Sequence, residues 1–193
     1  MKSFDLKTPL KTADVLALKV GDAATVSGTI YSMRDQAIRR ILDGGHGKDL
    51  PDLRGAAVYN CGPLARKIGY GKWELVSAGP TTSSRLNPLM PRMINDFGIT
   101  AIIGKGGMDD KVLKAMKGKC VYLSAVGGSG VISAMQLKVL GVKWLDLGMP
   151  EAMWTLQADK LGPLIVTMDA SGNSLYDKVS KKVARRLQEL VKQ

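Results

Sequence analysis

The sequence predicts an α/β protein with a substantially parallel sheet flanked by helices. From Gly55 onward, short apolar segments of strand length alternate with helical stretches, and most of these segments end in glycine-rich or polar turns. This alternation favours parallel strands joined by helical connections, with a ligand crevice at the carboxyl ends of the strands. The chain has 193 residues, 45% of them hydrophobic, which is enough for the core of one domain. We therefore expect a single domain over residues 1–193, with residues 44–53 as the best internal boundary.

The first part of the chain reads as strand and then as helix. Residues 6–33 are strand-like, and their β-branched run at 23–30 follows a Gly-Asp turn. Residues 35–42 are expected to form a helix, because the isoleucines lie on one face and the arginines on the other. The glycine-rich residues 44–47 would end this helix as a loop.

The later elements follow from the same patterns. Strands are expected at residues 55–59, 74–78, 100–104, 120–125, 142–147 and 164–169, and helices at 87–97, 109–116 and 131–140. An amphipathic helix is expected at the C-terminus, because apolar residues recur in steps of three and four at Tyr176, Val179, Val183, Leu187 and Leu190. Its cations would lie on a solvated face or meet an acidic partner subunit.

The composition indicates a cytoplasmic protein with anionic partners. No apolar run is long enough to cross a membrane, and the first residues lack the apolar core of a secretion signal. The net charge of +11 favours anionic ligands or surfaces. A basic nucleic-acid-binding module is the alternative from a different class of function. The aromatic content of 5%, without a stripe of alternating basic and aromatic residues, argues against it.

The cysteines indicate that this chain does not hold a metal centre alone. Cys61 and Cys120 are the only cysteines, and His46 is the only histidine. These residues fall short of the ligand set of a zinc site or an iron–sulfur cluster. Cys120 lies inside an apolar run and is expected to be a buried structural thiol, whereas Cys61 at a strand end is less certainly inert. Any metal would therefore have to be held mainly by another chain.

The segment from Ser77 to Lys105 carries the candidate site, a cradle for a small carboxylate. Two buried-strand patterns break into glycine-rich turns, which carry hydroxyls and long cations: Thr81, Thr82 and Arg85 in the first, and Lys105 with Gly106 in the second. Backbone N–H groups and fixed positive charges can converge there on an anion. The guanidinium of Arg85 offers a planar, two-pronged set of donors, and Lys105 acts as a compact charge. Arg34, just before a helix, would also be free to face a cleft.

Structural roles for the same residues remain open at this point. Arg85 could begin an exposed helix that Thr81 or Thr82 caps, and Lys105 could lie in a tight exposed turn. Residues 127–130 follow a strand as a dinucleotide-binding turn would, but Ser133 stands where that fingerprint requires its third glycine. A nicotinamide site is therefore disfavoured.

The ordered motifs resemble one known family along nearly the whole chain. They are Met33-Arg34-Asp35, Ala78-Gly79-Pro80-Thr81-Thr82 with Arg85, Ile103-Gly104-Lys105-Gly106-Gly107-Met108, Val126-Gly127-Gly128 and Leu147-Gly148-Met149-Pro150-Glu151-Ala152. The chain resembles the beta subunits of two-subunit class I fumarate hydratases and of L-tartrate dehydratases, and the C-terminal domain of single-chain class I fumarases. The resemblance implies a swivelling β/β/α domain that closes over the active site of an alpha subunit. The implied reaction is reversible hydration of fumarate to L-malate, with L-tartrate dehydration as the alternative.

The resemblance also implies a division of labour between subunits. A 4Fe–4S cluster is expected on the alpha partner and no metal ligand on this chain, which would act in a hetero-oligomer or as a homodimer of beta chains. Arg34, Arg85 and Lys105 are implied to bind carboxylates, with Thr82 and Gly106 lining the substrate site. Thr81 is implied to contact the substrate and to be a candidate for proton transfer, a role in which Lys105 would assist.

Two departures from the family pattern bear on the substrate. Ile38 stands where members often carry a histidine, and Ser84-Arg85-Leu86-Asn87 replaces a common Gly-Arg-Met-Asp. Both changes leave Arg34, Arg85 and Lys105 in place, so dicarboxylate binding is still expected. The choice among fumarate, tartrate and methylated relatives is left open.

Overall fold

The computed structural model describes residues 1–47 and 50–191, so residues 48 and 49 of the expected boundary lie outside it. Its main sheet has seven strands in the order β1-β2-β3-β6-β7-β9-β8. The bounds are Ser3–Lys7 for β1, Ala23–Ser32 for β2, Ala57–Tyr59 for β3, Ala101–Gly104 for β6, Val121–Ser124 for β7, Leu137–Lys143 for β8 and Met153–Met168 for β9. The described residues include no helix long and apolar enough to cross a membrane.

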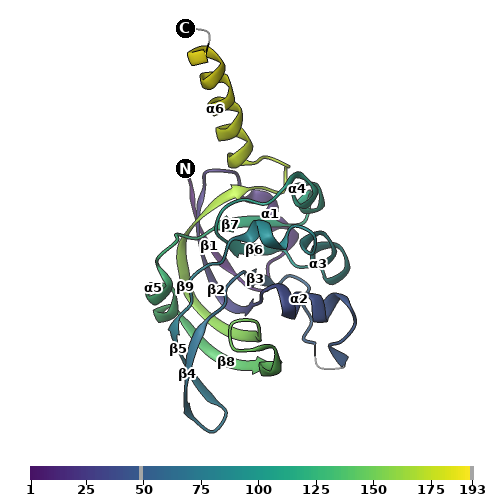
Figure 1. Ribbon diagram of the computed structural model, residues 1–193, viewed down its shortest axis with the longest axis vertical. Helices are drawn as coiled ribbons and strands as arrows, with labels where there is room; N and C mark the ends of the chain where they lie inside the picture. The colour runs from purple at the N-terminus through teal and green to yellow at the C-terminus, as the bar shows by residue number, and fades with distance from the viewer. Residues whose placement is uncertain (48–49, 192–193) are drawn as a thin grey trace.

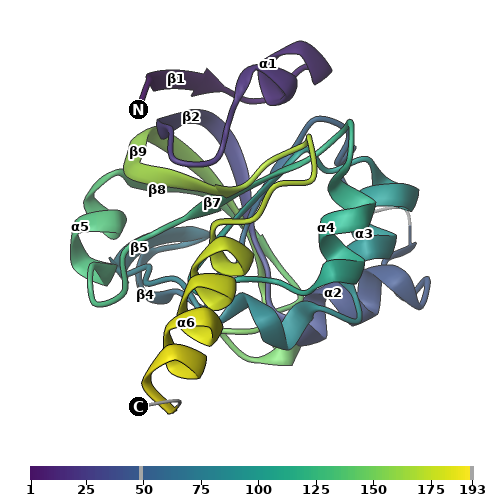
Figure 2. The ribbon, with the colours of Figure 1, turned by 90° about the horizontal axis from the view of Figure 1, so that it is seen from above.

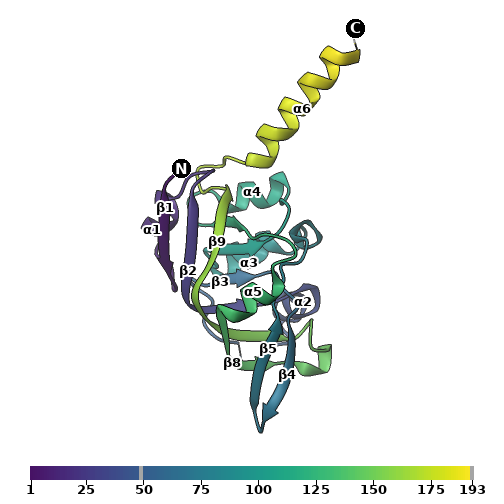
Figure 3. The ribbon, with the colours of Figure 1, turned by 90° about the vertical axis from the view of Figure 1, so that its left-hand side faces the viewer.

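Part of this sheet closes into a ring, because the long strand β9 pairs with two strands of the parallel set, β2 and β7. Strands β1, β2, β3, β6 and β7 pair in this order, and each pair is parallel. Strand β9 runs antiparallel to β7 on one side and to β2 on the other, which closes a ring of β2, β3, β6, β7 and β9 and leaves β1 paired with β2 outside it (Figures 1 and 3). Strand β8 pairs antiparallel with β9 outside this ring. The expected parallel sheet is thus present, but an antiparallel strand completes it.

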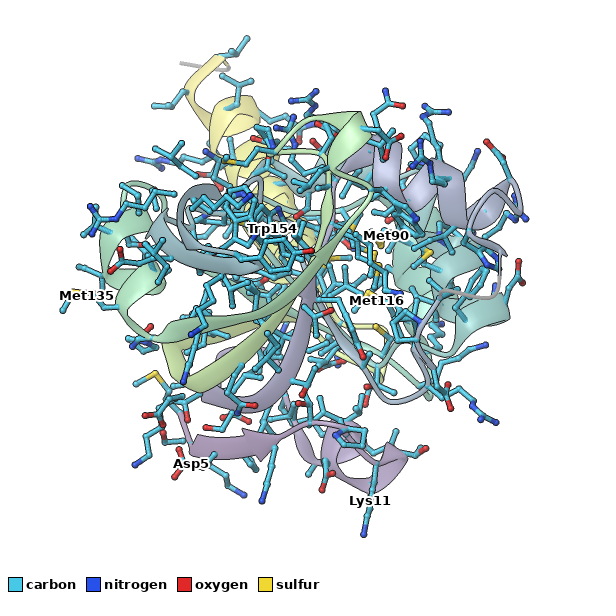
Figure 4. All side chains as sticks on the ribbon, turned by 90° about the horizontal axis from the view of Figure 1, so that it is seen from below. Asp5, Lys11, Met90, Met116, Met135 and Trp154 are labelled. Atoms are coloured by element: carbon cyan, nitrogen blue, oxygen red, sulfur yellow. The ribbon has the colours of Figure 1, made fainter. Side chains whose placement is uncertain are left out.

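Both faces of β3, β6 and β7 are buried, which explains their short, mainly apolar sequences. In β3 and β6, Tyr59 and Ile103 point into one core cluster, whereas Val58 and Ile102 point into the other. The first cluster fills the ring and contains Trp154. The second lies under the helices and contains Met90 and Met116, as Figure 4 shows from below.

Three of the six α-helices among the described residues cover one side of the ring. Helices α2 (Asp35–Leu42), α3 (Met90–Phe97) and α4 (Asp110–Met116) cover that side together (Figure 2). The other helices are α1 (Thr12–Ala17), α5 (Gly130–Met135) and α6 (Leu175–Val191), and the 3-10 turns are η2 (Ser83–Leu86) and η3 (Leu145–Leu147). Strands β4 (Leu64–Gly69) and β5 (Lys72–Ser77) form a separate antiparallel hairpin. Helices α2, α4 and α6 confirm the predicted helices at these positions.

Five of the predicted elements are corrected. The helix expected at residues 131–140 ends at Met135, and strand β8 occupies the rest. Residues 145–147 form η3 instead of the end of a strand, and residues 12–17 of the strand-like beginning form α1. Strand β9 begins at Met153, far before the strand expected at 164–169, and the strand expected at 74–78 belongs to the β4–β5 hairpin.

Candidate functional site

The predicted site residues lie at one edge of the sheet because neighbouring parallel strands end there. Arg34 follows β2, Asn60 and Gly62 follow β3, and Lys105 follows β6 directly. The carboxyl ends of parallel strands share an edge, so short turns after them place their side chains together. The turn after β5 crosses this edge through a bridge between Cys61 and Pro80.

Backbone hydrogen bonds fix Thr81 and Thr82 beside Lys105. The Thr81 N–H donates to the carbonyl of Asn60 at 2.7 Å, and the Lys105 N–H donates to the carbonyl of Thr81 at 3.2 Å. The Ser83 N–H donates in turn to the carbonyl of Lys105 at 3.0 Å. The segment therefore runs as an extra short strand between β3 and β6. It leaves the threonine hydroxyls and the Lys105 ammonium without a hydrogen-bond partner among residues 1–47 and 50–191.

A buried polar cluster supports this segment from below. Ser83 Oγ accepts hydrogen bonds from Asn60 Nδ2 and from the Tyr122 hydroxyl, each at 2.9 Å. All three side chains are buried. Gly104 makes room for the cluster, because a Cβ atom there would lie 1.9 Å from Ser83 Oγ. The cluster ties the turn after β5 to strands β3 and β7.

Arg34 is held at the start of α2 by an acidic residue from a distant turn. Its Nε lies 3.1 Å from Glu151 Oε1, although the N–H does not point at that oxygen. Glu151 Oε2 accepts a hydrogen bond from the Gln36 N–H at 3.0 Å. The Arg34 side chain also lies against Gly62, where a Cβ atom would come within 2.8 Å of Arg34 Cδ. Arg34 is thus packed and ion-paired while its side chain keeps 21% exposure.

Arg85 lies in η2 and faces the same helix start. Its Nη2 is 3.8 Å from Asp35 Oδ2, and its side chain is 55% exposed. This distance is too long for a hydrogen bond, so the guanidinium is steered by Asp35 but remains available to a ligand. Asp35 is in the first turn of α2, where a negative charge complements the helix dipole. Thr82 stands at the N-cap position of η2, but its side chain makes no capping bond.

The turn at Gly106 requires glycine and is covered by the last helix. Gly106 has φ of +72°, a conformation that other residues adopt only under strain. The Tyr176 hydroxyl donates to the Gly106 carbonyl, and its ring lies over Gly107, where a Cβ atom would be 2.7 Å from the ring. The Tyr176 hydroxyl also lies 3.3 Å from Ser124 Oγ. The first turn of α6 therefore fixes the loop that carries Lys105.

The cations lie on an open surface. Three cavities of about 220, 380 and 260 Å³ are lined by other parts of the chain. Lys105 is half-buried, and a Cβ atom on Gly127 would lie 3.8 Å from its Cδ. This edge therefore presents cations and hydroxyls together at the surface, with side-chain exposures of 21% for Arg34 and 55% for Arg85.

The two thiols do not fit an iron–sulfur cluster. Cys61 and Cys120 are fully buried, and burial raises the pKa of Cys61 to about 12 and that of Cys120 still further. A cluster ligand must be a thiolate, which these environments disfavour. Within residues 1–47 and 50–191, no group of three or more histidine, cysteine, aspartate or glutamate residues could hold a metal ion.

The structure thus brings the sequence-predicted residues to one edge and adds residues that the sequence did not indicate. Arg34, Arg85, Thr81, Thr82, Lys105 and Gly106 all occupy this edge. Glu151 and Tyr176 were missed as site residues because they reach it from distant turns. Glu151 does stand in one of the motifs that carry the resemblance, which was the only signal for it.

Known proteins are similar to this chain over almost its whole length. The family model described as the Fumarase C-terminus matches residues 1–179. The L(+)-tartrate dehydratase subunit beta of Escherichia coli K12 is 36% identical over 191 residues, covering 97% of this chain and 94% of that protein. A candidate L(+)-tartrate dehydratase subunit beta of Methanocaldococcus jannaschii is 44% identical over 187 residues, covering 94% of this chain and 95% of its own length.

A single-chain relative is similar over one part of its length. A candidate class I fumarate hydratase of Geobacillus stearothermophilus is 40% identical over 187 residues. The alignment covers 95% of this chain but only 35% of that protein, so the chain corresponds to one portion of the longer relative. The family match and these identities over almost the whole chain agree with each other, and the chain belongs to the Fumarase C-terminus family.

Proposed function

We propose that this chain is the beta subunit of a hydro-lyase that removes water from, or adds it to, a four-carbon dicarboxylate. One observation carries the proposal: Arg34, Arg85 and Lys105 gather with two threonine hydroxyls at one sheet edge in a member of this family. A substrate with a carboxylate at each end needs separated cations, and this edge supplies them. Arginine can bind a carboxylate through two parallel hydrogen bonds.

L-tartrate is the first substrate to test and fumarate the second. Relatives of matching length carry the name L(+)-tartrate dehydratase subunit beta, whereas the fumarate hydratase is the longer, single-chain relative. This reverses the order that the sequence motifs suggested. Both reactions place a carboxylate next to the carbon that gains or loses a proton, so the same cations would serve either one.

The proposed chemistry of this chain is binding, orientation and charge stabilisation. Removal of a proton next to a carboxylate moves negative charge onto that carboxylate, and fixed cations stabilise the charge as it develops. Arg85 and Lys105 would take this part, while Arg34 holds the other end of the substrate. Thr81 is the candidate for proton transfer, because its hydroxyl is free and lies on the same segment as Lys105.

The site is proposed to be completed by an alpha subunit that carries a 4Fe–4S cluster. The thiols of this chain are buried, and burial raises the pKa of each, so we do not assign them as its ligands. We propose that the chain swivels as a domain to close its open cationic edge over the partner. Activity is therefore expected only from the assembled subunits.

The experiment is anaerobic assembly with the alpha-type subunit from the same source, followed by assays of L-tartrate and fumarate. Loss of water from tartrate gives an enol that becomes 2-oxosuccinate, which is measured directly. Lys105→Met should lower kcat/KM at least about 100-fold, because a fixed charge on the developing anion is lost. Lys111→Met, an exposed lysine on α4, is the matched control and should leave it unchanged. Equal activity of both variants would contradict the assigned role of Lys105.

A further inference from the structure

Helix α6 leaves the body of the molecule without cover. It spans Leu175–Val191, and none of its 17 residues is buried. Figures 1 and 3 show it projecting away from the sheet and from the other helices. The apolar row that the sequence predicts is exposed along its length, with relative exposures of 54% for Val179, 60% for Val183, 59% for Leu187 and 53% for Leu190.

An exposed apolar row of this kind is typical of a surface that binds another chain. The four residues follow each other in steps of four, four and three, so they share one face of the helix. A single helix of this length is only marginally stable in water, and most helices in proteins are stabilised by packing an apolar face. The helix is about 25 Å long at 1.5 Å per residue, which is long enough for a helix-in-groove contact.

The charge on α6 selects an acidic partner over a second copy of this chain. Cations recur in steps of four as Lys178, Lys182 and Arg186, and again as Lys181 and Arg185. Two acidic residues, Asp177 and Glu189, accompany them, and Glu189 is paired with Arg186 at 3.0 Å. Two such helices side by side would bring like charges together, which disfavours pairing. A groove with carboxylates on its rim would instead attract the lysines and arginines of α6.

The root of α6 connects this surface to the dicarboxylate site. Tyr176 in the first turn binds the Gly106 carbonyl and covers Gly107, next to Lys105. A subunit that completes the site must approach the edge at which α6 begins. The apolar row would then lie along that subunit, continuous with the contact at the site.

We infer that α6 is the docking arm for the alpha-type subunit, which receives the row Val179, Val183, Leu187 and Leu190 in an apolar groove with an acidic rim. This inference rests on the proposed function, which requires such a subunit. It also predicts that docking and the position of Lys105 are coupled through Tyr176, so the arm is part of the assembled enzyme and not a dispensable tail.

The test measures assembly without turnover. The full chain is titrated with the alpha-type subunit from the same source, in the absence of substrate, and binding is followed by calorimetry or sedimentation. The double variant Val183→Gln/Leu187→Gln should bind at least tenfold more weakly. The matched control is Lys181→Gln/Arg185→Gln. It also introduces two glutamines on the same turns of the helix, but away from the apolar row. The Kd of this control for the alpha-type subunit should stay within about threefold of that of the unchanged chain at moderate salt, since the loss of exposed charges has a small effect.

Other outcomes would overturn the inference in distinct ways. Weakening by Lys181→Gln/Arg185→Gln but not by Val183→Gln/Leu187→Gln would mean attraction by charge alone, and no weakening by either would remove α6 from the interface. The isolated Val183→Gln/Leu187→Gln chain should keep its unfolding midpoint; a large drop would mean that the row packs on its own chain. A wild-type dimer that this variant dissociates would assign the apolar face of α6 to a second copy of this chain.

A complex that assembles through α6 but converts no dicarboxylate would contradict the proposed function. The inference that α6 is the docking arm would still hold.

Discussion

Arg34 and Glu151 face each other across the site edge, with 3.1 Å between Nε and Oε1, although 117 positions of the chain separate them. Glu151 also accepts a hydrogen bond from the Gln36 N–H in the first turn of α2. The carboxylate therefore serves two neighbours, the Arg34 guanidinium and the first turn of α2. Both side chains are about four-fifths buried, at 21% and 20% exposure. Glu151 is in this way a positioning residue for the first cation of the site.

Glu151→Gln tests this positioning role. The amide keeps an oxygen for the Gln36 N–H but loses the negative charge that attracts Arg34, so Arg34 becomes less fixed. We expect KM for the dicarboxylate to rise about tenfold, which corresponds to one ordinary charge-assisted contact. Glu74→Gln is the matched control, since Glu74 pairs with Arg66 on the β4–β5 hairpin. An unchanged KM in Glu151→Gln would show that Arg34 does not depend on its partner.

Arg85→Ala separates function from stability. Its contact with Asp35 is 3.8 Å long and its side chain is 55% exposed, so its removal should change the free energy of unfolding by less than about 1 kcal/mol. The same change should lower kcat/KM at least about 100-fold if the guanidinium binds the substrate. Arg54→Ala removes a more exposed ion pair outside the site and should leave activity intact. Urea unfolding and steady-state kinetics are the two measurements. A large loss of both stability and activity in Arg85→Ala would point to a structural role.

Ser83→Ala tests the buried cluster beneath the site. It removes the acceptor of two hydrogen bonds, from Asn60 and from Tyr122, and leaves both donors buried without that partner. We expect the free energy of unfolding to fall by about 1–3 kcal/mol. The exposed neighbour Ser84→Ala is the control and should change it little. In the double variant with Tyr122→Phe, one unpaired donor is removed, so the loss should be smaller than the sum of the single losses.

Stability should fall in alkaline solution because several buried acids resist ionisation. Burial raises the pKa of Cys61 to about 12, and it raises the pKa values of Cys120, Tyr59 and Tyr122 as well. In the unfolded chain these groups ionise near their ordinary values of 9.0 for cysteine and 10.0 for tyrosine. Between those values and the raised ones the folded state binds more protons, so a rise in pH favours unfolding.

The measurement is the urea midpoint from about pH 7 to about pH 10.5. The urea concentration at the midpoint should fall progressively above about pH 9, where the first of these groups ionises in the unfolded chain. The variant Cys61→Ala/Cys120→Ala removes two of the groups and should flatten the decline. A midpoint that stays constant or rises over this range would contradict the argument.

The sequence patterns predicted the parallel part of the sheet well and the antiparallel part poorly. Strands β3, β6 and β7 are buried on both faces and stand out as short apolar runs between turns. Strand β9 instead contains exposed polar residues at Asp159 and Lys160 and a Gly-Pro pair at 162–163, which read locally as a turn. Its pairing with β2 continues across these residues through irregular registers. Tertiary pairing outweighs local propensity there.

The candidate site was predictable where its residues follow strands directly. Arg34 and Lys105 lie immediately beyond apolar runs, so the shared edge of a parallel sheet brings them together. Glu151 and Tyr176 come from turns whose placement depends on β9 and α6, and no local pattern assigns them to the edge. The amphipathic pattern of α6 was correct, but periodicity alone does not say which molecule covers the apolar face.

The closure of the ring by β9 also has a consequence for synthesis of the chain. Ala23 and Ile165 are paired neighbours in the ring, so β2 cannot complete its hydrogen bonds until most of the chain has left the ribosome. Pairings between such distant segments form slowly, and an unpaired strand edge invites association with other chains in the meantime. The nascent protein therefore carries an open edge along β2 until its last strand arrives. Its yield in the cell should depend on how well that edge is protected during translation.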